Sequence, residues 1–353
     1  MSFRVEYTDV NTFKKMNRKP DFNNVLKVLK KEMPNRPTLF EPFINPEVIE
    51  VLADEETLKS NGGYNYQRAA IGAYKNAGYD YCSVQASSFK FRSGDAHSKN
   101  TISLNDAPLI TDRESFEKYV WNNPEDYDYS WLDRLGKELP DGMKFIVKGP
   151  SGVLENVIKI VGYDNLCFML ADEPDLASEI FDQVGSRLLK YYEIAVQYDS
   201  VGAAVVNDDW GFNTQTMLSP ASIKELVVPW HKKIVSAVHS AGKPAVLHSC
   251  GNLTGVWDDI IDNIGFDGKH SYEDKIEPVE QAYERLYPRI AVMGGIDMDY
   301  ICRQTPEEVY NRSKEMLKRA EGRGGYALGS GNSIPDYVPI PNYLAMISAA
   351  VFE

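Results

Sequence analysis

Two residues that can bind a soft metal ion, His248 and Cys250, stand at the end of an apolar run with the composition of a buried strand. Side chains two residues apart in a strand point to the same face, so the imidazole and the thiol would lie side by side. Both groups are ligands that suit zinc. The alternative is that both residues are simply half-buried at a strand end, with Gly251 marking the turn that follows.

Strand-like apolar segments alternate with helical patterns along the chain, and eight such strands are predicted. Eight alternating units are typical of a (β/α)8 TIM barrel, an α/β fold, with a doubly wound open sheet as the alternative. No GxGxxG motif follows the first strand to favour the open sheet. The predicted strands lie at 37–43, 78–86, 144–150, 201–207, 243–250, 264–270, 290–296 and 325–328.

The chain reads as one domain with a short addition at its N-terminus. Residues 1–20 are polar with few periodic apolar positions, and we expect them to form a tail or a lid. A helical pattern begins at Asp21, and residues 21–353 are predicted to form a single barrel domain. The expected fold is therefore a barrel with an N-terminal helical extension.

Polar and ionisable residues follow most of the predicted strands. Such groups are costly to bury singly. In a barrel, however, the carboxyl ends of all strands meet at one face, where these groups can form a site. The convergence predicts an active site drawn from Glu41, Gln85, Lys148, Asn207, Asp208, Asp209, Trp210, His248, Cys250, His270, Glu273, Asp297, Ser330 and Asn332.

The adjacent carboxylates Asp208 and Asp209 admit two interpretations. One of them can cap the following turn while the other contacts a ligand, and either residue fits either role. Neighbouring carboxylates also raise each other's pKa, so one could act as a general acid or base. His231 and His239 precede the fifth strand on a predicted helix and are interpreted as surface or packing residues.

The composition limits the classes of partner. The 353 residues are 43% hydrophobic and carry a formal charge of −13, which argues against nucleic acid or an anionic membrane surface as a partner. No apolar run reaches the roughly 18 residues that span a membrane, and the N-terminus lacks the apolar core of a signal peptide. Four widely spaced cysteines fit a reducing compartment, and we expect a cytoplasmic protein.

Several motifs resemble those of the uroporphyrinogen decarboxylase superfamily, whose members are (β/α)8 barrels. They are LHSCGN at 247–252, NDDWG at 207–211 ahead of LSP at 218–220, MGGID at 293–297, GN at 331–332, PD at 335–336 and NYLAM at 342–346. The resemblance covers the chain from about residue 20 to its end, and it is most specific in the second half.

Two branches of this superfamily differ in chemistry. Decarboxylases carry an Arg-Gln-Ala-Gly-Arg signature near the N-terminus, whereas residues 37–45 here contain Glu41 and no arginine. A site for a substrate with many carboxylates should be cationic, so this departure argues against that activity. Decarboxylases also have a histidine where this chain has Asn332. The corrinoid-dependent methyltransferases carry a His-x-Cys pair, matched by His248 and Cys250, and a later cysteine, whose position falls at Asn332.

The resemblance thus implies a methyltransferase that moves a methyl group between a small thiol, ether or amine and a corrinoid carried by a partner protein. Zinc would be held by His248 and Cys250 and completed by another group, with His270, Glu273, Asp209 and Glu41 as candidates. In the alternative, the site has lost its metal. A bound thiol would become a thiolate nucleophile, and a bound ether a better leaving group.

The resemblance also suggests roles for the residues at the strand ends. Asp208 or Asp209 would orient or protonate the substrate, and aromatic residues such as Tyr64, Tyr66, Phe89 and Phe91 could line a mouth that faces the corrinoid. The catalytic set is Asp208, Asp209, Asn332 and Glu41; the substrate-binding set is Gln85, Lys148, Asn207, Trp210 and Ser330; the metal set is His248, Cys250, His270 and Glu273.

Three other functions stay open at this point. They are a uroporphyrinogen-type decarboxylase, a metal-free methyltransferase that uses a folate, and a barrel that binds a ligand without catalysis. A homodimer is an expectation from the fold alone.

Overall fold

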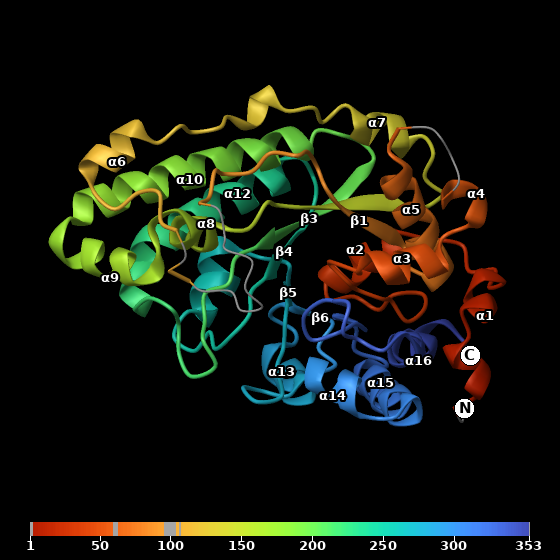
Figure 1. Cartoon of the computed structure of the whole chain (residues 1–353). Helices are drawn as coiled ribbons and strands as arrows, with labels where there is room; N and C mark the ends of the chain where they lie inside the picture. The colour runs from red at the N-terminus through yellow and green to blue at the C-terminus, as the bar shows by residue number, and fades with distance from the viewer. Residues whose placement is uncertain (1–2, 59–62, 95–103, 106, 353) are drawn as a thin grey trace.

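The computed structural model describes residues 3–58, 63–94, 104, 105 and 107–352 (Figure 1). Seven parallel strands form one sheet, and each strand pairs with the next one in the sequence, so the order is β1 to β7. The strands are β1 (Tyr81–Gln85), β2 (Lys144–Lys148), β3 (Val201–Asn207), β4 (Ala245–His248), β5 (Gly268–His270), β6 (Ala291–Met293) and β7 (Tyr326–Ala327).

The predicted first strand is present as a single bridge. Leu39 pairs in parallel with Leu328, which directly follows β7. On its other side the same segment reaches β1, because the Tyr81 hydroxyl donates to the Glu41 carbonyl over 3.0 Å. The two edges of the curled sheet therefore flank one segment, an arrangement consistent with the predicted barrel.

Helices connect the strands and cover the sheet. In Figure 1, α8, α10 and α12 lie together on the side of β3 and β4, and α14, α15 and α16 gather beside β6. The helices after the first 20 residues are α2 (Asn23–Leu29), α3 (Pro46–Leu52), α4 (Glu55–Leu58), α5 (Asn65–Ala77), α6 (Arg113–Lys118), α7 (Trp131–Gly136), α8 (Val153–Val161), α9 (Tyr163–Asp172), α10 (Pro174–Ala195), α11 (Pro220–Ser222), α12 (Val228–Ser240), α13 (Val279–Leu286), α14 (Met298–Arg303), α15 (Pro306–Ala320) and α16 (Ile340–Val351). Short 3-10 or π-helical segments occupy Pro124–Asp126, Ile223–Val227 and Asp259–Ile264.

The N-terminal residues pack against the C-terminal helix. A 3-10 turn (Val5–Thr8) and α1 (Val10–Lys14) lie next to α16, and the two ends of the chain lie close together in Figure 1. The ring of Tyr7 stacks on that of Phe352, with centroids 5.3 Å apart. The division into a tail or lid and a barrel domain stays a prediction.

Most predicted strands are shorter in the structure, and only β3 keeps its predicted bounds, while β4 ends at His248 and leaves Cys250 in the loop that follows. At β5 and β6 glycines set the limits. Gly265 has a φ of 85°, which closes the preceding π-helical segment, so β5 begins only at Gly268 instead of at residue 264. Gly294 and Gly295 have φ values of 73° and 113°, and β6 ends before them. A left-handed backbone suits glycine and interrupts the extended strand.

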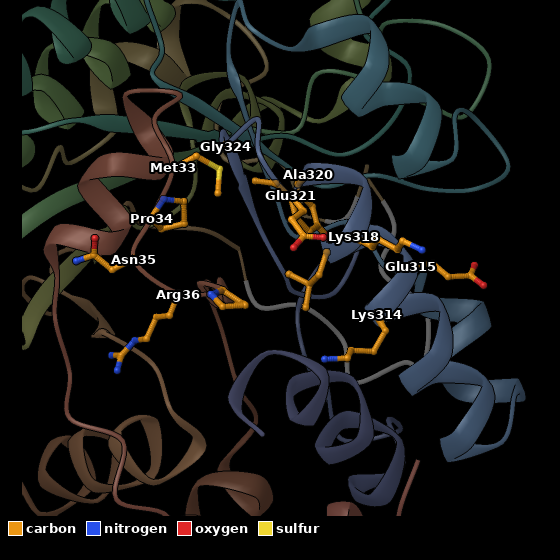
Figure 2. A pocket seen from close by; sticks show the side chains of 13 residues that line it. Met33, Pro34, Asn35, Arg36, Lys314, Glu315, Lys318, Ala320, Glu321 and Gly324 are labelled. Carbon is orange, nitrogen blue, oxygen red and sulfur yellow. The ribbon is translucent and has the colours of Figure 1, made fainter. Parts of the chain in front are cut away.

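A cavity of about 570 Å³ lies at the amino end of the sheet. Residues 33–37, just before the bridge segment, line it together with α15 and the start of β7 (Figure 2). Figure 2 displays a mixed wall, on which Lys314 and Lys318 stand beside Glu315 and Glu321. This cavity lies at the end of the sheet opposite to the polar residues that follow the strands.

Candidate active site

The register of the sheet brings two histidines together at the carboxyl ends of the strands. Asn207 of β3 pairs with His248 of β4, and His248 pairs with His270 of β5. Paired residues of neighbouring parallel strands point to the same face, so the two imidazoles lie next to each other. Their rings stack with centroids 5.0 Å apart, and their Nδ1 atoms are separated by 2.7 Å.

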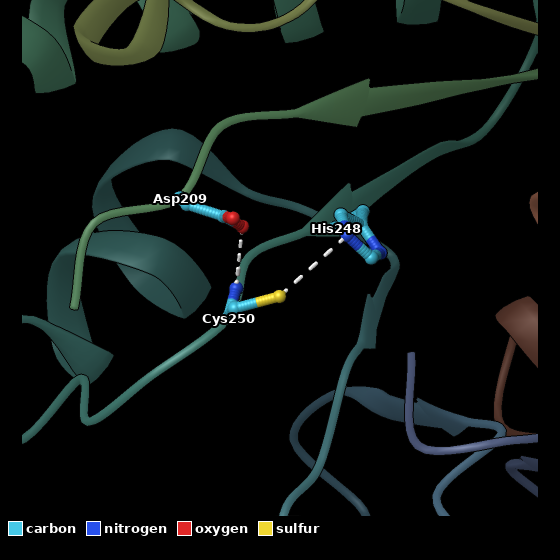
Figure 3. Close-up of side chains that lie close together, drawn as sticks. All are labelled: Asp209, His248 and Cys250. Atoms are coloured by element: carbon cyan, nitrogen blue, oxygen red, sulfur yellow. Dashed lines mark hydrogen bonds between the residues drawn. The ribbon is translucent and has the colours of Figure 1, made fainter. Parts of the chain in front are cut away.

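A three-residue cluster that could hold a metal ion lies beside these rings. Asp209, His248 and Cys250 each offer one ligand atom, and the three atoms lie within 4.8 Å of one another (Figure 3). His248 Nε2 and Cys250 Sγ are 3.8 Å apart, which is close to the edge of about 3.6 Å that a tetrahedral zinc site would have between nitrogen and sulfur. Asp209 is held in place because its Oδ1 accepts from the Cys250 amide at 2.7 Å. The donor set therefore fits zinc.

The hydrogen bonds behind His248 fix its tautomer. His270 Nε2 lies 3.1 Å from the Ser330 carbonyl oxygen, which can only accept, so this nitrogen carries a proton. Burial lowers the pKa of His270 well below its usual value, so the ring is neutral and its Nδ1 accepts from His248 Nδ1. Burial also lowers the pKa of His248, to about 4. Its Nε2 thus keeps a free electron pair, and this atom faces Cys250.

Two further donors surround the sulfur of Cys250. The Ser271 hydroxyl lies 3.4 Å away and the Asn332 amide Nδ2 lies 3.3 Å away. Ser271 has a φ of 87°, which is uncommon for a residue with a side chain and signals local strain. Burial, together with the nearby Asp209, raises the pKa of the thiol well above its usual range. The sulfur is thus enclosed by donors that would stabilise a thiolate.

The two adjacent carboxylates point in different directions. Both oxygens of Asp208 are occupied: Oδ2 accepts from the Leu154 amide at 3.0 Å and Oδ1 from the Glu155 amide at 2.9 Å. His231 Nε2 lies 2.8 Å from the same carboxylate, and both side chains are fully buried. Asp208 therefore holds the start of α8, while Asp209 belongs to the cluster that could hold a metal ion. His231 is a buried packing residue, one of the two roles expected for it.

Glu41 and Ser330 join the bridge segment to the loop after β7. The Glu41 carboxyl is fully buried and accepts from both the amide and the hydroxyl of Ser330, the latter at 2.9 Å. Burial raises the pKa of Glu41 to about 8, against the opposing effect of the Ser330 hydrogen bonds. Since the Ser330 carbonyl also faces His270, Glu41 lies at the far end of a hydrogen-bonded chain that reaches His248.

The other predicted residues lie around this centre. Gln85 and Lys148 line a cavity of about 650 Å³ at the ends of β1 and β2. Glu273 lines a second cavity of about 450 Å³, and its Oε1 accepts from the Gly251 amide at 3.3 Å. Trp210 is buried, and its ring packs against the ring of His231 with centroids 5.0 Å apart. It therefore lies next to the histidine that contacts Asp208. The Oδ1 of Asn207 is buried and has no hydrogen-bond partner among the described residues.

The sequence pattern did not predict the roles of three residues at this site, Ser271, Glu155 and Lys269. Ser271 contacts the sulfur, and Glu155 has a pKa raised to about 7 by burial and by the charges of Asp208 and Asp209. Lys269 is buried in the wall of the 450 Å³ cavity, and its ammonium donates to the Ser271 carbonyl. Alternation along β5 could have indicated Lys269, because His270 points into the site and its neighbour must point away. The position of Ser271 depends on the loop after β5 and that of Glu155 on how the start of α8 is placed, and the sequence pattern encodes neither.

Comparison with known proteins places these motifs in a family. Residues 100–351 match the family described as uroporphyrinogen decarboxylase (URO-D). The chain belongs to the URO-D family. Within the described residues, no helix of this URO-D protein is long and apolar enough to cross a membrane.

Relatives of two kinds are similar to this URO-D chain. One is a uroporphyrinogen decarboxylase from Myxococcus xanthus, 24% identical over 232 residues that cover 58% of this chain and 62% of the relative. Another is a methylated-thiol–coenzyme M methyltransferase from Methanosarcina mazei, 23% identical over 259 residues that cover 66% of this chain and 67% of the relative. A solved structure of a methyltransferase from Methanosarcina mazei has the same fold, with a TM-score of 0.67, 15% identity, and coverage of 93% of this chain and 97% of that one.

Proposed function

We propose that this protein is a methyltransferase that moves a methyl group between a small thiol, ether or amine and a corrinoid carried on a partner protein, with the assistance of zinc. The observation that carries the proposal is the cluster of Asp209, His248 and Cys250, in which His248 Nε2 has a free electron pair. The methylated-thiol–coenzyme M methyltransferase among the relatives supports the methyl-transfer chemistry. In this proposal the seven strands and the bridge segment close a (β/α)8 barrel, and the cluster lies at its mouth.

The metal would be held by the three residues of the cluster. Asp209 takes the third position, because its carboxylate lies within 4.8 Å of the ligand atoms of His248 and Cys250, whereas both ring nitrogens of His270 are engaged. When bound, zinc would supply a Lewis acid at the thiol sulfur or ether oxygen of the substrate. Asn332, which occupies the place of the later cysteine in related methyltransferases, would serve as a hydrogen-bond donor to the sulfur.

The remaining residues of the chain position this centre. His270 orients His248 and fixes its tautomer, as partners behind metal-binding histidines commonly do. Glu41 and Ser330 hold the loop whose carbonyl faces His270. Asp208 holds α8, and Asp209 alone reaches the centre. Gln85, Lys148 and Asn207 are assigned to the substrate.

A decarboxylase of a porphyrin-like acid is the second candidate, favoured by the Myxococcus xanthus relative. A site for such a substrate needs several cations to pair with its carboxylates. The segment at residues 37–45, where related decarboxylases carry arginines, has none here. The methyltransferase therefore accounts better for this chain. A cytoplasmic location and a homodimer stay predictions.

Methyl transfer with and without metal tests the proposal. The purified full chain is mixed with methylcobalamin and a thiol such as 2-mercaptoethanol, and loss of the methyl–cobalt bond is followed by its absorbance. We expect transfer by zinc-loaded protein, loss of transfer after treatment with a chelator, and recovery after zinc is added back. Uroporphyrinogen turnover that survives the chelator, without methyl transfer, would favour the decarboxylase instead.

A further inference from the structure

Ser271 has a backbone conformation that few residues with a side chain adopt. It directly follows β5, it is buried, and its φ of 87° lies in the left-handed region. Such a conformation persists only where the surrounding contacts hold it. In this conformation the Ser271 hydroxyl donates to Cys250 Sγ over 3.4 Å. A strained residue therefore supplies one of the hydrogen bonds to the sulfur of the Asp209, His248 and Cys250 cluster.

The peptide group between Ser271 and Tyr272 is held on both sides. Its carbonyl accepts from the ammonium group of Lys269, and its amide donates to the Gly331 carbonyl at 2.9 Å. The direction of this peptide group depends on the rotation of the Ser271 backbone. The two contacts therefore fix the conformation that brings the Ser271 hydroxyl to Cys250.

The contact made by Lys269 is the stronger of these two restraints. The side chain starts on β5 and is only 3% exposed, so little water competes for the ammonium. The ammonium lies 4.3 Å from the ring centre of Tyr272 and 5.6 Å from that of Trp257. A hydrogen bond from a charged donor is about twice as strong as a neutral one, and low polarity around it strengthens it further.

We propose that Lys269 is a positioning residue of the metal site, which keeps Ser271 in the left-handed conformation so that its hydroxyl donates to the Cys250 sulfur. The inference rests on the proposed zinc-assisted function. Lys269 acts on the sulfur through Ser271. The hydroxyl would draw electron density from a thiolate bound to metal, and partners behind metal ligands tune metal sites in this way.

Cobalt substitution tests the hydrogen bond to the sulfur. Cobalt(II) can replace zinc, and a cobalt–thiolate bond has a charge-transfer absorption whose energy falls when the sulfur loses a hydrogen bond. The purified full chain is loaded with cobalt, and its spectrum is recorded. We expect the band to be absent in Cys250→Ala and to move to longer wavelength in Ser271→Ala. Zinc affinity of Ser271→Ala should fall about tenfold.

Variants of Lys269 test the positioning role. Lys269→Met should move the band in the same direction, although it keeps the hydroxyl, whereas Lys275→Met, at an exposed lysine of the same loop, should not move it. Added to Ser271→Ala, Lys269→Met should cause no further shift. Added to Asn332→Ala it should still cause one, because the Asn332 amide is a separate donor to the sulfur at 3.3 Å.

A lysine with a purely structural role would lower the melting temperature without moving the band. An unmoved band in folded Lys269→Met, or a further shift when it is combined with Ser271→Ala, would overturn the inference. Lys269→Gln replaces the methionine variant if that variant does not fold, and the same outcomes apply to it. Lys269→Arg retains a charged donor and should retain most of the original band position.

The proposed function can fail separately. A chain that binds zinc and transfers methyl groups, but whose cobalt band does not respond to Ser271 or Lys269, retains the function and loses only this inference. A chain that binds cobalt through Cys250 with the expected shifts, but transfers no methyl group, loses the methyltransferase function and retains the positioning role. A chain that binds neither metal overturns both.

Discussion

The two halves of the proposed mouth bury polar groups in opposite ways. At β4 and β5, His248, Cys250 and His270 are connected by hydrogen bonds to Asp209 and Ser330. At β1 and β2, Lys148 is half-buried beside a cavity with aromatic residues in its wall and has no carboxylate partner among the described residues. In the first half the polar groups contact one another, whereas in the second half a charged side chain faces a cavity.

This difference suggests that the β4–β5 half is a rigid centre and the β1–β2 half a site of ligand recognition. Polar networks whose members are all satisfied are rigid and orient their groups closely. A buried charge left unpaired carries an energetic cost that a ligand of opposite charge can offset. We therefore expect changes in the β4–β5 half to affect metal binding and changes in the β1–β2 half to affect ligand preference and stability.

Loss of the thiol at Cys250 should have the largest effect. Cys250→Ala removes one of three proposed ligands, and we expect zinc affinity to fall on the order of 100-fold or more. Cys302→Ala, at a free cysteine of α14, is the matched control and should retain zinc. Zinc content per chain after dialysis, measured by mass spectrometry, checks the prediction. Equal zinc content in the two variants would contradict the assignment of Cys250.

Glu41, which is hydrogen-bonded to Ser330 behind His270, should control the pH dependence of stability. Its pKa is raised to about 8 by burial, so the folded state keeps a proton that the unfolded state releases above about 4.5. The stability of the unaltered protein should therefore fall as pH rises from 4.5 to 8. Glu41→Gln lacks this titration, and its free energy of unfolding relative to the unaltered protein should increase by a few kcal/mol over that range.

Urea unfolding of both proteins at pH 5 and pH 8 measures this difference. Gln can still accept from the Ser330 amide, so the loop contact is preserved in the variant. A stability difference that is the same at both pH values would mean that Glu41 is ionised throughout the range.

Removal of the hydrogen-bond partner behind His248 should weaken the metal site by a smaller amount. His270→Phe leaves His248 Nδ1 without an acceptor, and we expect zinc affinity to fall about 10- to 100-fold. His270→Gln offers an amide oxygen at this position and should preserve more of the affinity. Competition with a chromophoric chelator measures both, and equal affinities of the two variants would argue against the tautomer assignment.

The smallest effect is expected from Lys148→Met in the absence of ligand. Because the pKa of Lys148 is lowered to about 8, its charged form destabilises the folded state at neutral pH. The variant should be about 1–2 kcal/mol more stable at pH 7. This advantage should shrink as pH rises through 8 towards the usual lysine pKa, and zinc binding should not change. A variant that is less stable at pH 7 would show that the ammonium is already satisfied by the chain.

The sequence determined the fold and the composition of the site. The alternation of strands and helices predicted the parallel sheet in sequential order. His248 Nε2 and Cys250 Sγ lie 3.8 Å apart, as expected, although β4 ends at His248 and Cys250 belongs to the loop that follows. The polar residues after each strand converge because parallel strands share their carboxyl edge. These features depend on local periodicity, which the sequence contains directly.

Only the tertiary structure decided which role each residue of the site has. Nothing in the sequence distinguishes Asp208 from Asp209, but the contact with α8 occupies one and leaves the other at the centre. The contacts of His248 with His270 and of His270 with Ser330 join the ends of three strands. Lys148 contacts the Pro42 carbonyl and no carboxylate of the described residues, which depends on which segments pack around it. Such contacts arise between segments distant in the chain, and they depend on the angle at which each loop leaves its strand, which local residue patterns do not fix.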